Sequence, residues 1–98
     1  MNVSRVFHDI AFEWDSRKAA ENVRKHDVLF ELACEAFFDP FVYYLEDETV
    51  SGELRETIIG LSATWKLLFV VYVLRRDVIR IVSARLATVE ERKRYEDQ

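Results

Sequence analysis

The chain has 98 residues, of which 50% are hydrophobic and 33% are charged, and its formal net charge is −4. This length and composition support one folded domain over residues 1–98 and exclude a disordered protein. The single cysteine, Cys34, excludes an intramolecular disulfide and fits a reducing cytoplasm. No signal-peptide pattern is present, and the longest apolar run, residues 67–74, is well short of the roughly 20 residues that span a bilayer.

Charge is unevenly distributed along the chain. Residues 28–62 carry eight acidic side chains and one arginine, whereas residues 63–98 carry eight basic and five acidic side chains. The overall acidity argues against a general nucleic-acid binder, but the distribution suits an anionic substrate on one side and a basic partner on the other.

The first part of the chain predicts one strand followed by two helices. We expect residues 1–6 to form a flexible lead-in. Apolar and polar residues alternate over residues 10–15, which predicts a short strand. Apolar residues at helical spacing predict helices over residues 16–26 and 30–37, and Asp15 is a suitable N-cap for the first of them.

Asp39-Pro40 ends the second helix, because a residue before proline avoids the α region. The β-branched and aromatic segments that follow predict an antiparallel meander of four strands, over residues 41–46, 54–62, 66–74 and 78–85. The third of these strands is continuously apolar, so we expect it in the middle of the sheet. Thr88 and Glu91 match the capping-box pattern and predict a final helix.

The predicted fold class is therefore α+β. It comprises an antiparallel sheet, made of the four-stranded meander and the short N-terminal strand, with two N-terminal helices on one face and a short C-terminal helix.

Arginines on the predicted sheet are the leading candidates for chemistry. Arg80 and Arg85 lie five residues apart on one strand, and Arg55 lies two strands away. The odd separation places Arg80 and Arg85 on opposite faces unless the strand departs from regular pleating after Ile81. Several guanidinium groups on one sheet face suit a phosphate clamp, whereas ion pairs with glutamates such as Glu53 are the structural alternative.

Candidates for proton transfer lie at the end of the first predicted helix. His26 titrates near neutral pH and can act as a general acid or base, or it can stabilise the helix end through the dipole. Lys25 is either a phosphate ligand or a solvated charge. Arg76, Arg92 and Tyr95 are further candidates for contact with a substrate.

Other kinds of site find little support in the sequence. It has no glycine-rich phosphate loop, no paired cysteines and only two isolated histidines, so we expect no cofactor and no metal site. Cys34 lies on the apolar side of the second helix, which favours a buried structural thiol. Ser62 and Ser83 lack the flanking pattern of a serine hydrolase.

Taken together, these segments resemble the BrnT ribonuclease toxins. The segment FEWDSRKAAENVRKHDVLFELACEAFFDP is similar to the opening of that family, and RIVSARLATVEERKRYE is similar to its end. The motifs FEWD, KH, DP, RIxSAR and ExxxYE occur in the family's order and spacing, and the resemblance covers residues 12–96. Asp27 stands where the family commonly has glycine, Leu29 where it has serine, and Trp65 where a small residue is common.

The resemblance implies a RelE-like fold and a metal-independent endoribonuclease that arrests bacterial growth as the toxin of a type II toxin–antitoxin pair. The implied partner is BrnA, an antitoxin similar to ribbon-helix-helix DNA-binding proteins. The implied complex is a heterotetramer that represses its own operon, so contact with DNA is indirect and no membrane is involved.

For this activity we expect Arg80, Arg85 and Arg55 to bind the scissile phosphate, with Lys25 or His26 as the acid or base. One alternative is a non-catalytic module whose arginine-rich sheet face receives an acidic partner or nucleic acid. Another is a structural subunit that pairs an exposed strand edge with a second chain.

Overall fold

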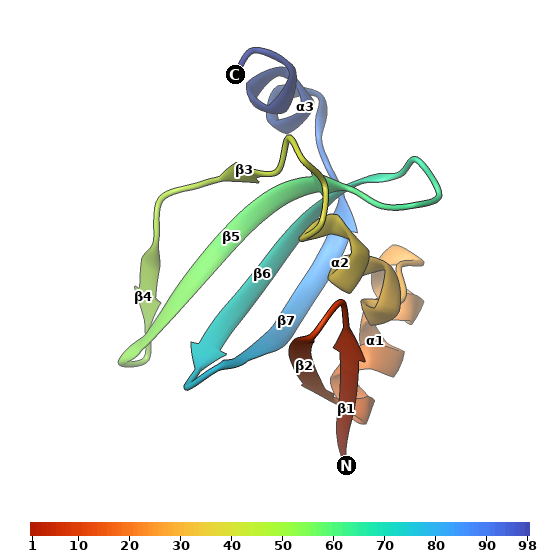
Figure 1. Ribbon diagram of the computed structural model, residues 1–98, viewed down its shortest axis with the longest axis vertical. Coiled ribbons are helices and arrows are strands. Elements are labelled where there is room, and N and C mark those ends of the chain that lie inside the picture. Colours follow the sequence, from red (N-terminus) through yellow and green to blue (C-terminus); the bar gives the residue numbers. More distant parts are fainter.

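The computed structural model describes residues 1–98 and contains seven strands and three helices (Figure 1). In chain order these are β1 (Asn2–Phe7), β2 (Ile10–Asp15), α1 (Ser16–His26), α2 (Phe30–Ala36), β3 (Tyr43–Tyr44), β4 (Glu48–Val50), β5 (Glu53–Leu61), β6 (Leu67–Arg75), β7 (Val78–Leu86) and α3 (Val89–Glu96). The sheet has the order β1-β2-β7-β6-β5-β3, and β4 pairs separately with β5. None of the helices is both long and apolar enough to cross a membrane.

The α+β fold and the antiparallel meander are confirmed. β5, β6 and β7 pair in sequence order, and the apolar β6 lies between the other two, as its composition predicts. The strand expected over residues 41–46 is much shorter, because Asp39 closes a turn just before it. The Asp39 carboxylate accepts a hydrogen bond from the Phe41 amide, and its carbonyl accepts one from the Val42 amide.

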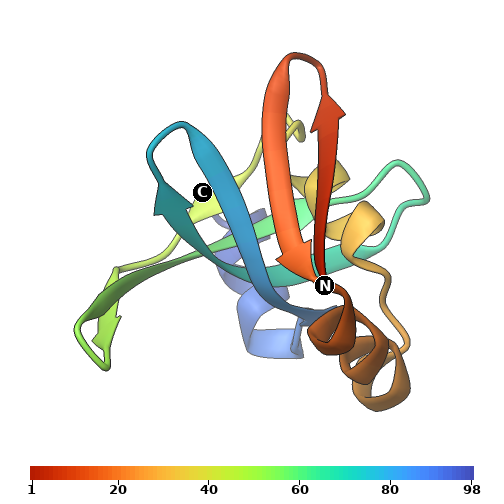
Figure 2. The same cartoon turned by 90° about the horizontal axis from the view of Figure 1, so that it is seen from below.

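The flexible lead-in expected over residues 1–6 is wrong, because β1 forms an antiparallel hairpin with β2 along its whole length. Val3 and Phe7 pack against the hydrophobic core, which holds this strand in place. The hairpin turn is made by His8 and Asp9, both at positive φ, without the glycine that usually marks such a turn. Figure 2 shows β2 running beside β7, with β1 outside it; the β2–β7 pairing is parallel.

The main core lies between the sheet and α2, and it holds Cys34 among its 13 buried residues. Burial raises the pKa of the Cys34 thiol to about 12, so it is a protonated structural group at neutral pH. β5 approaches α2 so closely that a Cβ on Gly60 would lie 2.4 Å from the carbonyl oxygen of Ala36. Glycine is therefore required at this crossing.

The helix ends follow the predicted signals. Asp15 accepts a hydrogen bond from the Arg17 amide as the N-cap of α1, and Asp27 ends the helix in the left-handed conformation, at a φ of 55°. Leu29 occupies the N-cap position of α2, where its side chain forms no capping hydrogen bond. The predicted capping box is present at the start of α3.

Candidate active site on the sheet face opposite α1 and α2

A β-bulge interrupts β7 immediately after Ile81. Ile81 lies opposite Tyr72, but Ser83, rather than Val82, lies opposite Val71. Val82 is therefore an extra residue in β7, and it shifts the alternation of side chains by one position.

The bulge places Arg80 and Arg85 on the same face of the sheet. Arg80 lies opposite Val73 and Arg85 opposite Phe69, and these two β6 residues are four positions apart, so they share a face. Continuing the β5–β6 register by one residue places Arg55 on this face too, across from Val73. We call this surface the arginine face; the core and α2 lie on the other side of the sheet.

Arg80 is held by the N-terminal hairpin. Its Nη1 donates to Glu13 Oε2 at 2.8 Å and to Asn2 Oδ1 at 2.8 Å. Glu13 lies directly beside Arg80 in the parallel β2–β7 pair, so the two side chains project from the same face. Strand β2 therefore supplies a carboxylate, and β1 an amide oxygen, that the sequence alone did not connect with Arg80.

Arg85 is held by α3. Its two terminal nitrogens donate to the two carboxylate oxygens of Glu91 at 2.8 and 2.9 Å, and its guanidinium lies 4.0 Å from the centre of the Phe69 ring. The hydrogen bonding raises the pKa of Arg85 and lowers the pKa of Glu91. Glu91 also accepts the Thr88 amide in the capping box, so one carboxylate fixes α3 to β7.

Arg55 differs from the other two arginines, because it forms no ion pair. Its Nε is buried and has no hydrogen-bond partner. Glu53, which the sequence offered as a partner, pairs instead with Arg75 at 3.0 Å. Arg55 is thus the arginine on this face whose charge no carboxylate neutralises.

The structure does not bring the expected acid–base pair to the arginines. Lys25 is exposed and pairs with Glu21 at 3.0 Å on the surface of α1. His26 is exposed at the end of the same helix, and its side chain makes no hydrogen bond. Neither side chain forms a hydrogen bond or an ion pair with a residue of the arginine face, so the acid–base assignment gains no support from the geometry.

The remaining candidates are also dispersed. Arg76 lies in the β6–β7 turn at a φ of 59°, and Arg92 is exposed on α3. The Tyr95 hydroxyl donates to Asp39 Oδ2 at 2.5 Å, so it anchors α3 to the turn after α2. Burial and this hydrogen bond raise the pKa of Tyr95 to about 12.

Asn22 is a positioning residue that the sequence reasoning missed. It is buried on α1, and its side-chain amide donates to the carbonyls of Ala84 and Val28 and accepts from the Ala84 amide. It thereby provides hydrogen-bond partners for the Ala84 backbone, directly before Arg85, at the edge of β7 beyond the part that pairs with β2. The available signal was its place three residues after Ala19, which puts a polar group on the apolar side of the helix.

Comparisons with known proteins identify the family of this chain. The family described as "Ribonuclease toxin, BrnT, of type II toxin-antitoxin system" matches residues 14–91. The chain belongs to the BrnT family. It is therefore a ribonuclease toxin of a type II toxin–antitoxin system, with RNA as its substrate and an antitoxin as its partner.

A solved structure shows the same fold. The crystal structure of the Brucella abortus ribonuclease toxin BrnT is 20% identical in sequence and has a TM-score of 0.52, covering 76% of this chain and 92% of that chain. A search of curated proteins found no significant match.

Proposed function

We propose that this BrnT-family chain cleaves RNA on the arginine face without a metal ion, in the cytoplasm where its substrate is made. We also propose that a BrnA-like ribbon-helix-helix antitoxin neutralises it. One observation carries the enzymatic part: the bulge at Val82 puts Arg80 and Arg85 on the sheet face that also holds Arg55, and the carboxylates of Glu13 and Glu91 pair with the first two.

The proposed reaction is an in-line attack by the ribose 2′-oxygen on the adjacent phosphorus. The 2′-hydroxyl gives its proton to a base as the 2′-oxygen bonds to phosphorus. The bond from phosphorus to the 5′-oxygen breaks, and the 5′-oxygen takes a proton from water, so the products are a 2′,3′-cyclic phosphate and a 5′-hydroxyl. Charge increases on the phosphate oxygens in the transition state, so fixed cations lower the barrier. Guanidinium groups can supply this charge in place of a metal ion.

Arg55 and Arg80 form the proposed phosphate clamp. They flank Val73 on the two neighbouring strands, which separates their backbones by two strand spacings, or roughly 10 Å. Both side chains are long enough to reach one phosphate between them. Glu13, already 2.8 Å from Arg80, is the proposed base that accepts the 2′-hydroxyl proton.

Arg85 contributes to the same surface at the other end of the face, about four residues further along β6, or roughly 13 Å. Its charge is balanced by Glu91 in the free protein. When RNA binds here, Arg85 exchanges the Glu91 carboxylate for an RNA phosphate. We therefore propose that Arg85 binds a phosphate next to the scissile one.

Substitution of Arg80 tests the clamp. We expect Arg80→Ala to lower the rate of RNA cleavage by about 10²–10³-fold, as loss of one transition-state donor typically does. Arg24→Ala is the matched control, because it removes the same charge from an exposed site on α1. Thermal midpoints of both variants distinguish loss of the fold from loss of chemistry. Equal cleavage by folded Arg80→Ala and Arg24→Ala would refute the assignment.

Two further measurements test the finer claims. Cleavage should persist in excess EDTA, and its abolition would show that a metal ion is required. Growth arrest on expression of this chain should be relieved by co-expression of a BrnA-like ribbon-helix-helix protein. Continued arrest with that protein present would rule it out as the antitoxin.

A further inference from the structure

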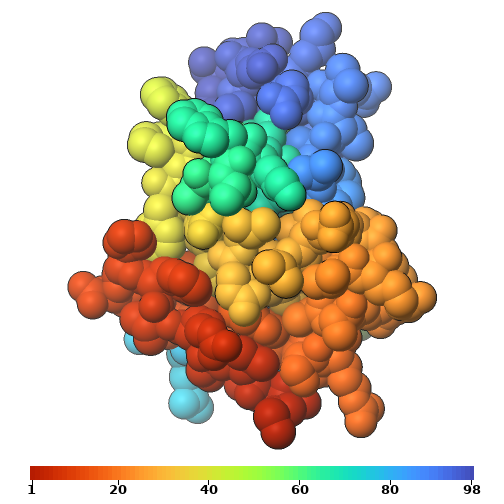
Figure 3. All heavy atoms as spheres, turned by 90° about the vertical axis from the view of Figure 1, so that its right-hand side faces the viewer, coloured from red at the N-terminus to blue at the C-terminus, as the bar shows by residue number.

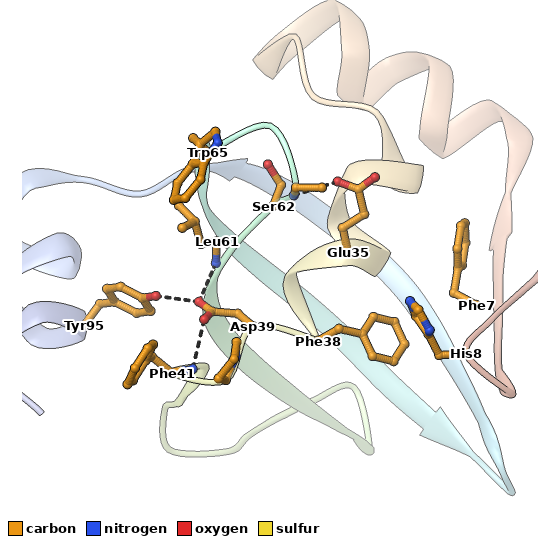
Figure 4. A pocket seen from close by; sticks show the side chains of 12 residues that line it. Phe7, His8, Glu35, Phe38, Asp39, Phe41, Leu61, Ser62, Trp65 and Tyr95 are labelled. Atoms are coloured by element: carbon orange, nitrogen blue, oxygen red, sulfur yellow. Dashed lines mark hydrogen bonds between the residues drawn. The ribbon is translucent and has the colours of Figure 1, made fainter.

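An apolar cleft of about 470 Å³ is lined by none of the three arginines of the arginine face (Figure 4). Its walls are the tip of the β1–β2 hairpin, the turn after α2, the β5–β6 turn and α3. Figure 3 shows α2 and the β5–β6 turn side by side on one surface, with the N-terminal hairpin beside them and α3 at the far end.

Large aromatic side chains line this cleft and remain open to solvent. Phe41 is 67% exposed and Trp65 is 82% exposed, and the cleft is also lined by Phe38. Trp65 occupies the β5–β6 turn at a φ of 65°, a conformation that is costly for a bulky residue. Exposed aromatic residues gathered around a cleft are typical of a protein interaction site.

Two acidic side chains line the cleft, together with the polar side chains of His8, Ser62 and Tyr95. The acidic residues are Glu35 and Asp39, and no lysine or arginine lines the cleft. Asp39 already accepts hydrogen bonds from the amides of Phe41 and Leu61 and from the Tyr95 hydroxyl, which lower its pKa although partial burial acts in the opposite direction. Asp39 is therefore negatively charged at neutral pH.

We propose that this cleft binds an apolar segment of the antitoxin that carries at least one lysine or arginine. The proposal rests on the toxin–antitoxin pairing proposed above and adds the surface on which that pairing occurs. The apolar part of the segment buries the exposed aromatics, and its cation lies against Glu35. The sign of the cleft's charge is what selects this occupant, because carboxylates attract a basic peptide and repel the phosphates of RNA.

A segment bound in the cleft also contacts α3, the helix that holds Arg85. Tyr95 lines the cleft, and Glu91, one turn earlier on α3, forms the bidentate pair with Arg85. A segment bound against Tyr95 keeps α3 in place and thereby keeps Glu91 on Arg85. Antitoxin binding in the cleft therefore disfavours the exchange of Glu91 for an RNA phosphate without covering the arginine face.

The test measures the affinity of the purified antitoxin encoded beside this chain for cleft variants. Phe41→Glu places a third carboxylate where an aromatic ring is expected to be buried. Trp65→Asn removes the indole and substitutes a residue that tolerates positive φ, so the turn keeps its shape. Leu74→Glu is the matched control, because Leu74 is also exposed, at 54%, but lies at the far end of β6.

We expect each cleft variant to weaken antitoxin binding by at least about tenfold, as loss of a buried aromatic anchor typically does, and Leu74→Glu to change it by less than about threefold. The emission of Trp65 should shift to shorter wavelength as antitoxin is added, whereas Trp14 is already buried and should not respond. The shift should therefore be absent in Trp65→Asn.

Several results would overturn the docking proposal. These are unchanged antitoxin affinity in both cleft variants, an equal loss in Leu74→Glu, or no complex with the wild-type chain. Loss of RNA cleavage in the folded cleft variants would assign the cleft to RNA instead. Cleavage by the free wild-type chain is measured in parallel. If the wild-type chain binds antitoxin but cleaves no RNA, the proposed enzymatic function is refuted and the docking site is not. If the wild-type chain cleaves RNA and both cleft variants bind antitoxin normally, only the docking site is refuted.

Discussion

Replacing Asn22 with alanine should destabilise this protein far more than other polar substitutions on α1. The side-chain amide makes three buried hydrogen bonds to backbone groups, at 2.9 Å to the Val28 carbonyl and at 2.8 and 3.1 Å to the carbonyl and amide of Ala84. Alanine cannot replace any of them, so three buried backbone groups would lose their partners.

The expected loss follows from these contacts. Each hydrogen bond contributes about 1 kcal/mol to the free energy of unfolding, and the higher helix propensity of alanine offsets about 0.6 kcal/mol of the loss. The expected net destabilisation is roughly 2–3 kcal/mol. For a domain of this size, that lowers the thermal midpoint by roughly 10–20 °C. Lys18→Ala on the exposed side of α1 should change stability by less than about 0.5 kcal/mol.

Thermal unfolding of both variants, followed by circular dichroism, measures this difference. Amide hydrogen exchange adds a local readout, because the Ala84 amide should exchange faster in Asn22→Ala than in wild type under native conditions. Equal midpoints for Asn22→Ala and Lys18→Ala, with unchanged exchange at Ala84, would refute the role assigned to Asn22 in closing the edge of β7.

Two further predictions concern the Arg85–Glu91 pair and the crossing of β5 over α2. Glu91→Gln should lower stability at neutral pH by about 1 kcal/mol, because the ion pair is only partly buried. The hydrogen bond from Arg85 lowers the pKa of Glu91 from its ordinary 4.5, so this contribution is present above pH 4.5 and is lost as the pH falls below it. Denaturant titrations should therefore show the stabilities of wild type and Glu91→Gln converging as the pH falls below 4.5, and a difference independent of pH would contradict the charge-based explanation. Gly60→Ala should cost about 3 kcal/mol because its Cβ meets the Ala36 carbonyl, whereas Gly52→Ala, in open space at a φ of 78°, should cost about 1 kcal/mol. Equal costs in urea unfolding would mean that β5 and α2 can separate without penalty.

The local part of the fold was predictable from the sequence. Asp15 and Thr88 cap helices, and the apolar run of β6 lies in the middle of the sheet. These features depend on neighbouring residues and on side-chain periodicity, which the sequence displays directly. The β1–β2 hairpin was missed for the same reason, since His8 and Asp9 adopt positive φ without the glycine that normally signals the turn.

The candidate site divides in the same way. The sequence alone identified Arg80 and Arg85 and showed that they share a face only if β7 departs from regular pleating after Ile81. Only the tertiary structure decided that the bulge exists and that Glu13 and Glu91 lie against these arginines. The physical reason is that pleating is a local property of one strand. The partner of a side chain across the sheet depends instead on strand register and on pairing between segments that are far apart in the sequence.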